Sequence, residues 1–254
     1  MLPFETLFAS WPQYVATCLL LAVAQAVYVL FGFGGGLVAV GCLALVLVNI
    51  QDVVVMLVLV YLPAELYVAV TSRKEISWRG VLLVCAGVAG GVPLGAWLLK
   101  HSEPTFVLAL LAGFLIVAGL AFLLLPRHRS VRWPPWTAPP VGALAGLLGG
   151  MFGTGGPPVI LYYQLGGMAK SAFRGSLMTI FLFVSLVRLP AYATAGLITE
   201  ERLVSSLAVM PVVLIGAWLG NRIHLQMAEQ TFQRLVSVFL IVVGLVIGAR
   251  WLGP

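Results

Sequence analysis

Two glycine clusters interrupt long apolar runs of the sequence. The clusters are Gly34, Gly35 and Gly36 in the first half of the chain and Gly153, Thr154, Gly155 and Gly156 in the second. A short apolar segment follows each cluster, and a helix beginning there would direct its unbonded N–H groups and the positive end of its dipole toward the glycines. This geometry favours a bound anion. The seven residues are therefore the predicted anion-binding positions.

Arg188 lies inside the apolar run 175–196, just before Leu-Pro-Ala at 189–191. A charge at that depth costs about 2.5 kcal/mol or more, so it must face protein or water and have a partner. Glu65 directly follows the matching Leu-Pro-Ala at 62–64. Two interpretations stay open. Arg188 and Glu65 form a structural ion pair, or Arg188 binds an anionic substrate while Glu65 responds to protons.

Four more polar side chains inside apolar runs are candidate pathway or coupling residues. They are Gln25, Gln164, Ser176 and Tyr192. An intramembrane amide either lines a path or bonds to a neighbouring helix. A serine either lines the path or bonds back to its own helix.

The sequence lacks the residue combinations that catalysis or metal binding requires. The histidines lie in or beside loops, and no Gly-x-Ser-x-Gly turn or paired acidic residues occur, so no catalytic residue is expected. Cys18, Cys42 and Cys85 all lie in apolar runs, where they are expected to pack rather than to form disulfides or hold a metal. No cofactor is expected.

The elements that position these residues must be membrane helices. Of 254 residues, 61% are hydrophobic and 9% are charged, and the mean hydropathy is +1.09. Water-soluble domains carry far more charge, and the apolar runs are too long for barrel strands. The sequence therefore predicts an all-α integral membrane protein, with room for roughly seven to ten spans. The net charge of +6 lies mostly in short loops, where it reports orientation rather than nucleic-acid binding.

Three matches, in the same order, indicate an internal duplication. Phe-Gly-Phe-Gly-Gly at 31–35 aligns with Phe-Gly-Thr-Gly-Gly 121 residues later. Gly-Ala-Trp-Leu at 95–98 also recurs 121 residues later, and Leu-Pro-Ala at 62–64 recurs after 127. We predict a first membrane repeat over 1–126, a linker over 127–138 and a second repeat over 139–254.

Each repeat is expected to contain a glycine-broken helix hairpin, re-entrant or short, plus three transmembrane helices. A hairpin that enters and leaves on one side gives each repeat an odd number of crossings, so the two repeats are inverted. This arrangement gathers most Arg and Lys side chains on one face, as the positive-inside rule prefers. It places both termini outside the cytoplasm.

The glycine motifs resemble the paired signatures of the TauE/SafE sulfite exporter family. They are Gly-Phe-Gly-Gly-Gly-Leu at 32–37 and Gly-Met-Phe-Gly-Thr-Gly-Gly-Pro-Pro at 150–158, and Arg-Gly-Ser-Leu at 174–177 resembles the segment that follows the second signature. The resemblance implies transport of sulfite, sulfoacetate or another organosulfonate across the bacterial inner membrane, with both termini periplasmic. Members often carry proline where this chain has Gly41, which implies a more flexible first half-helix.

These features predict a secondary transporter that exports a small anion by alternating access, with the anion bound near the bilayer midplane. The expected partners are the anion and the lipid bilayer. Coupling to protons or another ion, and the oligomeric state, stay open. The alternatives are an anion channel or facilitator for a different small anion and, with less support, an intramembrane enzyme.

Overall fold

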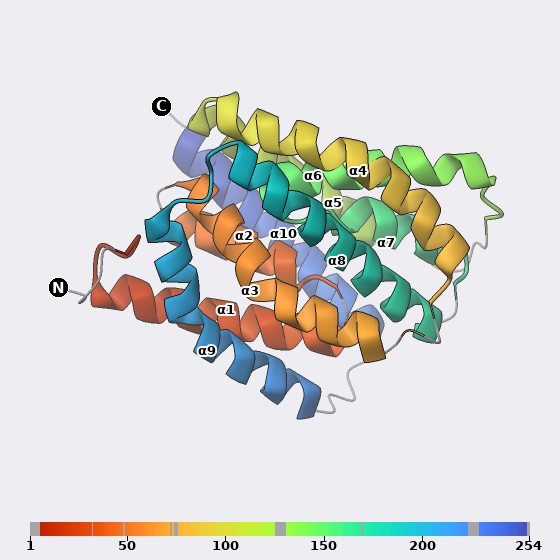
Figure 1. Cartoon of the computed structure of the whole chain (residues 1–254), viewed down its shortest axis with the longest axis horizontal. Helices are drawn as coiled ribbons and strands as arrows, with labels where there is room; N and C mark the ends of the chain where they lie inside the picture. Colours follow the sequence, from red (N-terminus) through yellow and green to blue (C-terminus); the bar gives the residue numbers. More distant parts are fainter. Residues whose placement is uncertain are drawn as a thin grey trace. The chain divides into compact units, whose positions relative to one another are not determined.

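The computed structural model is entirely helical over the residues it describes, which are 6–31, 33–47, 49–71, 73, 76–124, 131–168, 170–222 and 229–252 (Figure 1). Its helices are α1 (Trp11–Phe31), α2 (Gly35–Val46), α3 (Ile50–Thr71), α4 (Trp78–His101), α5 (Pro104–Leu124), a 3-10 turn η1 (Pro135–Thr137), α6 (Ala138–Phe152), α7 (Gly156–Leu165), α8 (Lys170–Thr194), α9 (Glu200–Arg222) and α10 (Glu229–Leu252). Gly32 of the first motif and residues 127–130 of the predicted linker lie outside the described residues.

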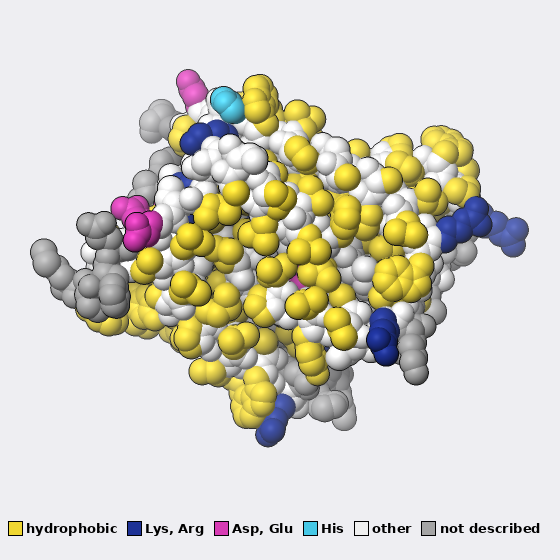
Figure 2. Space-filling model, in the orientation of Figure 1, with side chains coloured by type: hydrophobic (Ala, Val, Ile, Leu, Met, Phe, Trp, Pro, Cys, Tyr) yellow, Lys and Arg dark blue, Asp and Glu magenta, His cyan; other side chains and the backbone are white. Residues whose placement is uncertain are grey.

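Seven helices within the described ranges are long and apolar enough to cross a membrane, namely α1, α3, α4, α5, α8, α9 and α10. The helices beside the glycine breaks include three short ones, with 12 residues in α2, 15 in α6 and 10 in α7. Hydrophobic side chains cover most of the face shown in Figure 2, with few charges among them. The chain is therefore a multi-pass, all-α membrane protein, as the composition predicts.

Both glycine breaks lie at the tip of an antiparallel helix hairpin. In the first, Gln13 Nε2 donates to the Val46 carbonyl at 3.0 Å, which joins the start of α1 to the end of α2. In the second, Val131 N donates to the Leu165 carbonyl at 2.7 Å, which joins the approach to α6 to the end of α7. The chain therefore reverses at both breaks, whereas the plan of a hairpin plus three transmembrane helices and the inversion of the two halves stay predictions.

A glycine with positive φ turns the chain at each tip. These are Gly34, with φ of 86°, and Gly153, with φ of 77°. Side chains strongly disfavour this region of backbone conformation, so glycine is the residue that lets the chain reverse here.

The chain divides into two compact units, and each draws on both halves of the sequence. Unit 1 comprises Met1–Val60, His101–Leu124 and Gly196–Pro254, and unit 2 comprises Tyr61–Lys100 and Leu125–Ala195. Unit 1 thus holds the α1–α2 hairpin, and unit 2 holds the α6–α7 hairpin. The repeats predicted from the sequence, 1–126 and 139–254, are not the same division of the chain and stay a prediction.

In unit 1, glycines allow helices from different halves of the chain to approach closely. A Cβ at Gly220 of α9 would lie 2.6 Å from the Ala26 carbonyl oxygen of α1. A Cβ at Gly119 of α5 would lie 2.7 Å from the Ser237 oxygen of α10. Small residues at helix interfaces are a common basis of packing in membranes.

In unit 2, α4 packs on α6 in the corresponding way. A Cβ at Gly146 would lie 2.9 Å from the Val88 oxygen, and one at Gly95 would overlap the Leu147 oxygen. The first helix of each hairpin therefore packs on a helix from the other half of the chain, α1 on α9 and α6 on α4. The matched Gly-Ala-Trp-Leu segments take part in both contacts. Close contacts of the same kind occur at Gly87, Gly91, Gly149 and Gly150. A Cβ at Gly90, by contrast, would meet no described atom within 4 Å.

Candidate anion-binding site

Arg188 lies at the tip of the α6–α7 hairpin. Its side chain projects from α8 and is only 3% exposed. The Nη1 group donates a hydrogen bond to the Gly153 carbonyl at 3.2 Å, and Nε donates to the Tyr192 hydroxyl, also at 3.2 Å. The guanidinium carbon lies 5.2 Å from the centre of the Tyr192 ring. Arg188 therefore lies beside the second glycine cluster, and its role in binding an anion stays a prediction.

Tyr192 ties this arginine to the helix that ends at the break. Its side chain is fully buried, and its hydroxyl donates to the Gly150 carbonyl at 2.7 Å. The carbonyls of Gly150 and Gly153 belong to the last turn and cap of α6, where carbonyls lack helical partners. A cation at this negative end of the helix dipole is favourable. Arg188 and Tyr192 thus stabilise the C-terminal end of α6.

Backbone donors follow immediately. Within the described residues, the N–H groups of Thr154, Gly155 and Gly156 have no hydrogen-bond acceptor. The next two residues are prolines and carry no N–H. Gly155 must be glycine because a Cβ there would overlap the Ala145 carbonyl oxygen of α6. Three N–H groups, the N-terminus of α7 and a guanidinium therefore lie within a few residues of Gly153, and this combination attracts negative charge.

The first break is closed by packing. A Cβ at Gly35 would overlap the Ala24 oxygen and would lie 2.6 Å from Tyr28 Cβ, so α2 lies directly against α1. Gly34 accepts a helical hydrogen bond from Val38 N at 2.9 Å, and Gly36 is buried. Gly41, at the position where a proline was expected, lies in an unbroken α2, and its Cβ would lie 2.9 Å from Val243 Cγ1. Its glycine thus has a packing role.

Comparison with known proteins agrees with these motifs. The profile of the family described as "Sulfite exporter TauE/SafE" matches residues 17–247, which is most of the chain. The chain belongs to the TauE/SafE family. Membership in this family of transporters agrees with the expectation that the chain is not an enzyme.

Two relatives of this TauE/SafE protein carry transporter names. A "Probable sulfite/organosulfonate exporter TauE" of Cupriavidus necator is 29% identical over 217 residues, covering 84% of this chain and 85% of the relative. A "Probable inner membrane transporter protein TsaS" of Comamonas testosteroni is 25% identical over 191 residues, covering 75% and 80%. No solved structure matches.

The remaining predicted residues of this TauE/SafE chain fall into both units. Glu65 of unit 2 is 4% exposed, and Gln25 of unit 1 is 1% exposed, with no described partner for its Oε1. Gln164 is half-buried on α7. Ser176 accepts a hydrogen bond from Ser77 N at 3.1 Å, so it anchors the segment before α4. Their roles in a pathway, and the choice between the two roles for Glu65, stay predictions.

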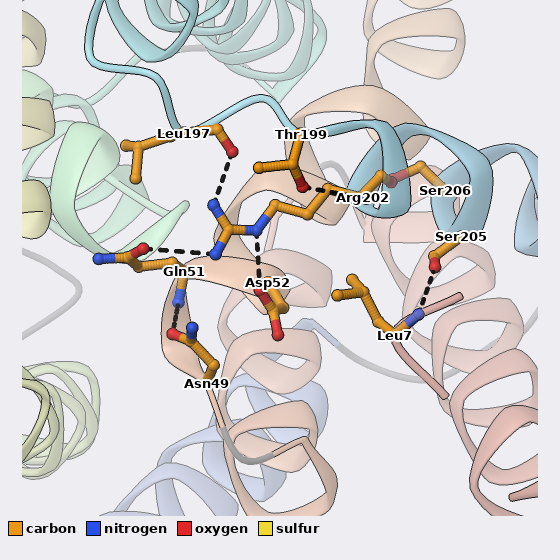
Figure 3. A network of polar contacts seen from close by, with 9 residues as sticks. All are labelled: Leu7, Asn49, Gln51, Asp52, Leu197, Thr199, Arg202, Ser205 and Ser206. Atoms are coloured by element: carbon orange, nitrogen blue, oxygen red, sulfur yellow. Dashed lines mark hydrogen bonds and ion pairs between the residues drawn. The ribbon is translucent and has the colours of Figure 1, made fainter. Parts of the chain in front are cut away.

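A second buried arginine was not anticipated. Arg202, at the start of α9, is 8% exposed, and its Nε lies 2.7 Å from Asp52 Oδ1 (Figure 3). It also donates to the Leu197 carbonyl at 2.6 Å and to Gln51 Oε1 at 3.3 Å. Its partner Asp52 is 150 residues away and no local pattern links the two, so the sequence alone gives no sign of this pair.

Proposed function

We propose that this TauE/SafE protein is a secondary transporter that exports a small sulfur-containing anion, such as sulfite, sulfoacetate or another organosulfonate, across the bacterial inner membrane. The family and the name of the Cupriavidus necator relative support this substrate class, and the name of the Comamonas testosteroni relative supports the inner membrane. One observation carries the proposal. The 3% exposed guanidinium of Arg188 lies beside a glycine break whose next three N–H groups have no described acceptor.

In this proposal the anion binds at the second break. A sulfite or sulfonate group presents three oxygens, which can accept hydrogen bonds from several donors at once. Thr154, Gly155 and Gly156 supply backbone donors, and Arg188 supplies positive charge. Hydrogen bonds between charged partners are about twice as strong as those between neutral ones. Gly34, Gly35 and Gly36 stay candidates, and packing alone explains Gly35.

Transport follows the inverted-repeat scheme. The two halves rock so that the anion faces alternate sides of the membrane, with both termini in the periplasm. Glycines at both tips support this scheme, because they leave each hairpin free of side chains that would fill the turn. Glu65, buried in the same unit as Arg188, is the candidate for proton coupling.

The test is counterflow of labelled sulfite in proteoliposomes containing purified wild-type protein, Arg188→Ala or Arg202→Gln. A guanidinium that donates two hydrogen bonds to a charged ligand contributes about 1.5–3 kcal/mol for each. We therefore expect the sulfite flux of Arg188→Ala to fall about 100-fold or more. Arg202→Gln breaks the Asp52 ion pair and lowers the melting temperature, but each folded molecule keeps its rate.

Normal flux in folded Arg188→Ala protein would disprove the assigned site. Flux without counterflow or saturation would indicate a channel and overturn alternating access. Arg250→Ala is a second control should Arg202→Gln be poorly folded, since Arg250 is exposed and bonds to the Leu45 carbonyl of unit 1.

A further inference from the structure

The hydroxyl of Tyr163 is buried without a partner. The residue, on α7, is 4% exposed, and its oxygen has no hydrogen-bond partner among the described residues. Buried tyrosine hydroxyls normally find one. The oxygen lies 3.5 Å from the position that a Cβ on Gly80 would occupy. It is therefore directed at the first turn of α4.

The first turn of α4 presents backbone N–H groups that can donate hydrogen bonds. Val81 N bonds to the Ser77 carbonyl at 3.0 Å, whereas the N–H groups of Arg79 and Gly80 have no acceptor in the described part of the chain. Ser77 Oγ lies 3.6 Å from the same Cβ position. The hydrogen bond from Ser77 N to Ser176 Oγ holds this residue against α8.

The chemistry of this cluster selects an anion. Two backbone N–H groups and two hydroxyls converge on the positive end of a 24-residue helix, which repels cations and attracts negative charge. Gly80 leaves room for about one methyl group beside the two hydroxyls, because a Cβ there would make only ordinary contacts with them. The exposed Arg79 adds positive charge to this end of the helix.

Helix α7 links this cluster to the second glycine break. Gly156 and Tyr163 are both buried, and they lie seven residues apart, which is about two helical turns or 10.5 Å on the same face. One short helix therefore begins at the break and carries near its end the hydroxyl directed at α4.

We propose that the Tyr163 hydroxyl, the Ser77 hydroxyl and the first-turn N–H groups of α4 form a second anion site, the α4 site, which a small sulfur oxyanion occupies on its way to or from the break. The substrate class rests on the proposed function, while the site itself rests on the donors described here. The Tyr163 hydroxyl is buried, whereas Ser77 and Arg79 are exposed, so a free oxyanion and a lipid phosphate can both reach these donors and the test below distinguishes the two sources.

Two substitutions test the α4 site in the full-length protein. Tyr163→Phe removes only the hydroxyl, and Gly80→Ala fills the space without a clash. Each is expected to raise the apparent KM for sulfite about tenfold, the effect of losing a hydrogen bond to a charged ligand. Maximal flux per folded molecule should change less than twofold. Thermal-shift titration with methanesulfonate should show a matching loss of affinity.

Matched controls come from neighbouring positions. Tyr162 accepts a hydrogen bond from Thr137 Oγ1 at 3.3 Å and stacks on Trp133, so Tyr162→Phe removes a hydroxyl that already has a partner. Gly90→Ala adds a methyl group to α4 where nothing lies within 4 Å. Both should retain the wild-type KM.

The outcomes separate this inference from the proposed function. Wild-type KM in both test variants, with transport lost in Arg188→Ala, overturns the α4 site and leaves the proposed function standing. Weaker methanesulfonate binding in the test variants, without sulfite transport by the wild type, supports the α4 site and overturns the proposed function. Adding phosphatidylglycerol to the detergent is a further test. If it abolishes the difference in methanesulfonate affinity between the wild type and the test variants, the site binds a lipid phosphate and the substrate role is overturned.

Discussion

The two glycine hairpins turn in the same way but are held at their tips by different interactions. In the first, the backbone of α2 packs on α1, and Tyr28 Cβ lies 2.6 Å from the position of a Gly35 Cβ. In the second, Arg188 and Tyr192 donate hydrogen bonds to the carbonyls of Gly153 and Gly150 at 3.2 and 2.7 Å. One tip is held by close packing and the other by buried polar side chains.

The predicted duplication allows the residues near the two tips to be compared position by position. Aligning Leu-Pro-Ala at 62–64 with its copy 127 residues later places Tyr61 opposite Arg188 and Glu65 opposite Tyr192. The same pair of positions, one helical turn apart, thus holds a phenol and a carboxylate in one half and a guanidinium and a phenol in the other. The aligned positions differ in charge, and this difference supports the proposal that the second half binds the anion.

The largest effect should come from filling either tip. Gly35→Ala and Gly155→Ala each place a methyl group on a carbonyl oxygen, so each should cost about 3 kcal/mol or more by overpacking. We expect both to reduce the yield of monodisperse protein in size-exclusion chromatography. Gly113→Ala is the control, because nothing described lies within 4 Å of its Cβ position. If only one tip proves sensitive, the two hairpins do not share one backbone requirement.

A smaller effect should distinguish the two halves. Tyr192→Phe removes the acceptor of Arg188 Nε and the donor to Gly150, so affinity for sulfite should fall about tenfold as Arg188 loses its position. Tyr61→Phe, at the equivalent position to Arg188, should change the affinity less than twofold. Titration by thermal shift measures both. Equal losses in the two variants would contradict the assignment of anion binding to the second half.

The smallest effect is expected at Gln25. Its Oε1 is buried without a described partner, so Gln25→Leu removes an unsatisfied polar group and should leave stability unchanged or raise it by about 1 kcal/mol. If α1 lines the transport path, flux falls while stability holds. Melting temperature and flux, measured on the same preparation, separate packing from a pathway role. A marked loss of stability would show that the amide is bonded after all.

Local signals explain why part of this structure was predictable. Glycine clusters and prolines indicate a break because they are unfavourable inside a helix. An arginine inside an apolar run indicates a buried, partnered charge because a charge in the membrane costs free energy. The hairpins and Arg188 at the second break were found in this way. Gly90 could not be told from the neighbouring interface glycines, because a glycine with open space beside it has the same sequence signature as one at an interface.

Pairings between distant residues carry no such signal. Tyr192 reaches Gly150 across 42 positions, and Arg202 reaches Asp52 across 150. In the sequence, Tyr192 looks like an ordinary residue of an apolar run and Arg202 like an ordinary loop charge, so neither one indicates its partner. The same holds for the Tyr163 hydroxyl, which becomes conspicuous only when Gly80 is known to lie beside it.

The sequence alone determined that this chain lies in a membrane and that glycines interrupt its helices at two places, because hydropathy and backbone freedom depend on residue type. Tertiary structure decided which helices pack on each hairpin and which carbonyls Arg188 and Tyr192 bind. Those choices depend on distances between segments far apart in the chain, where shape and hydrogen-bond geometry select the partner.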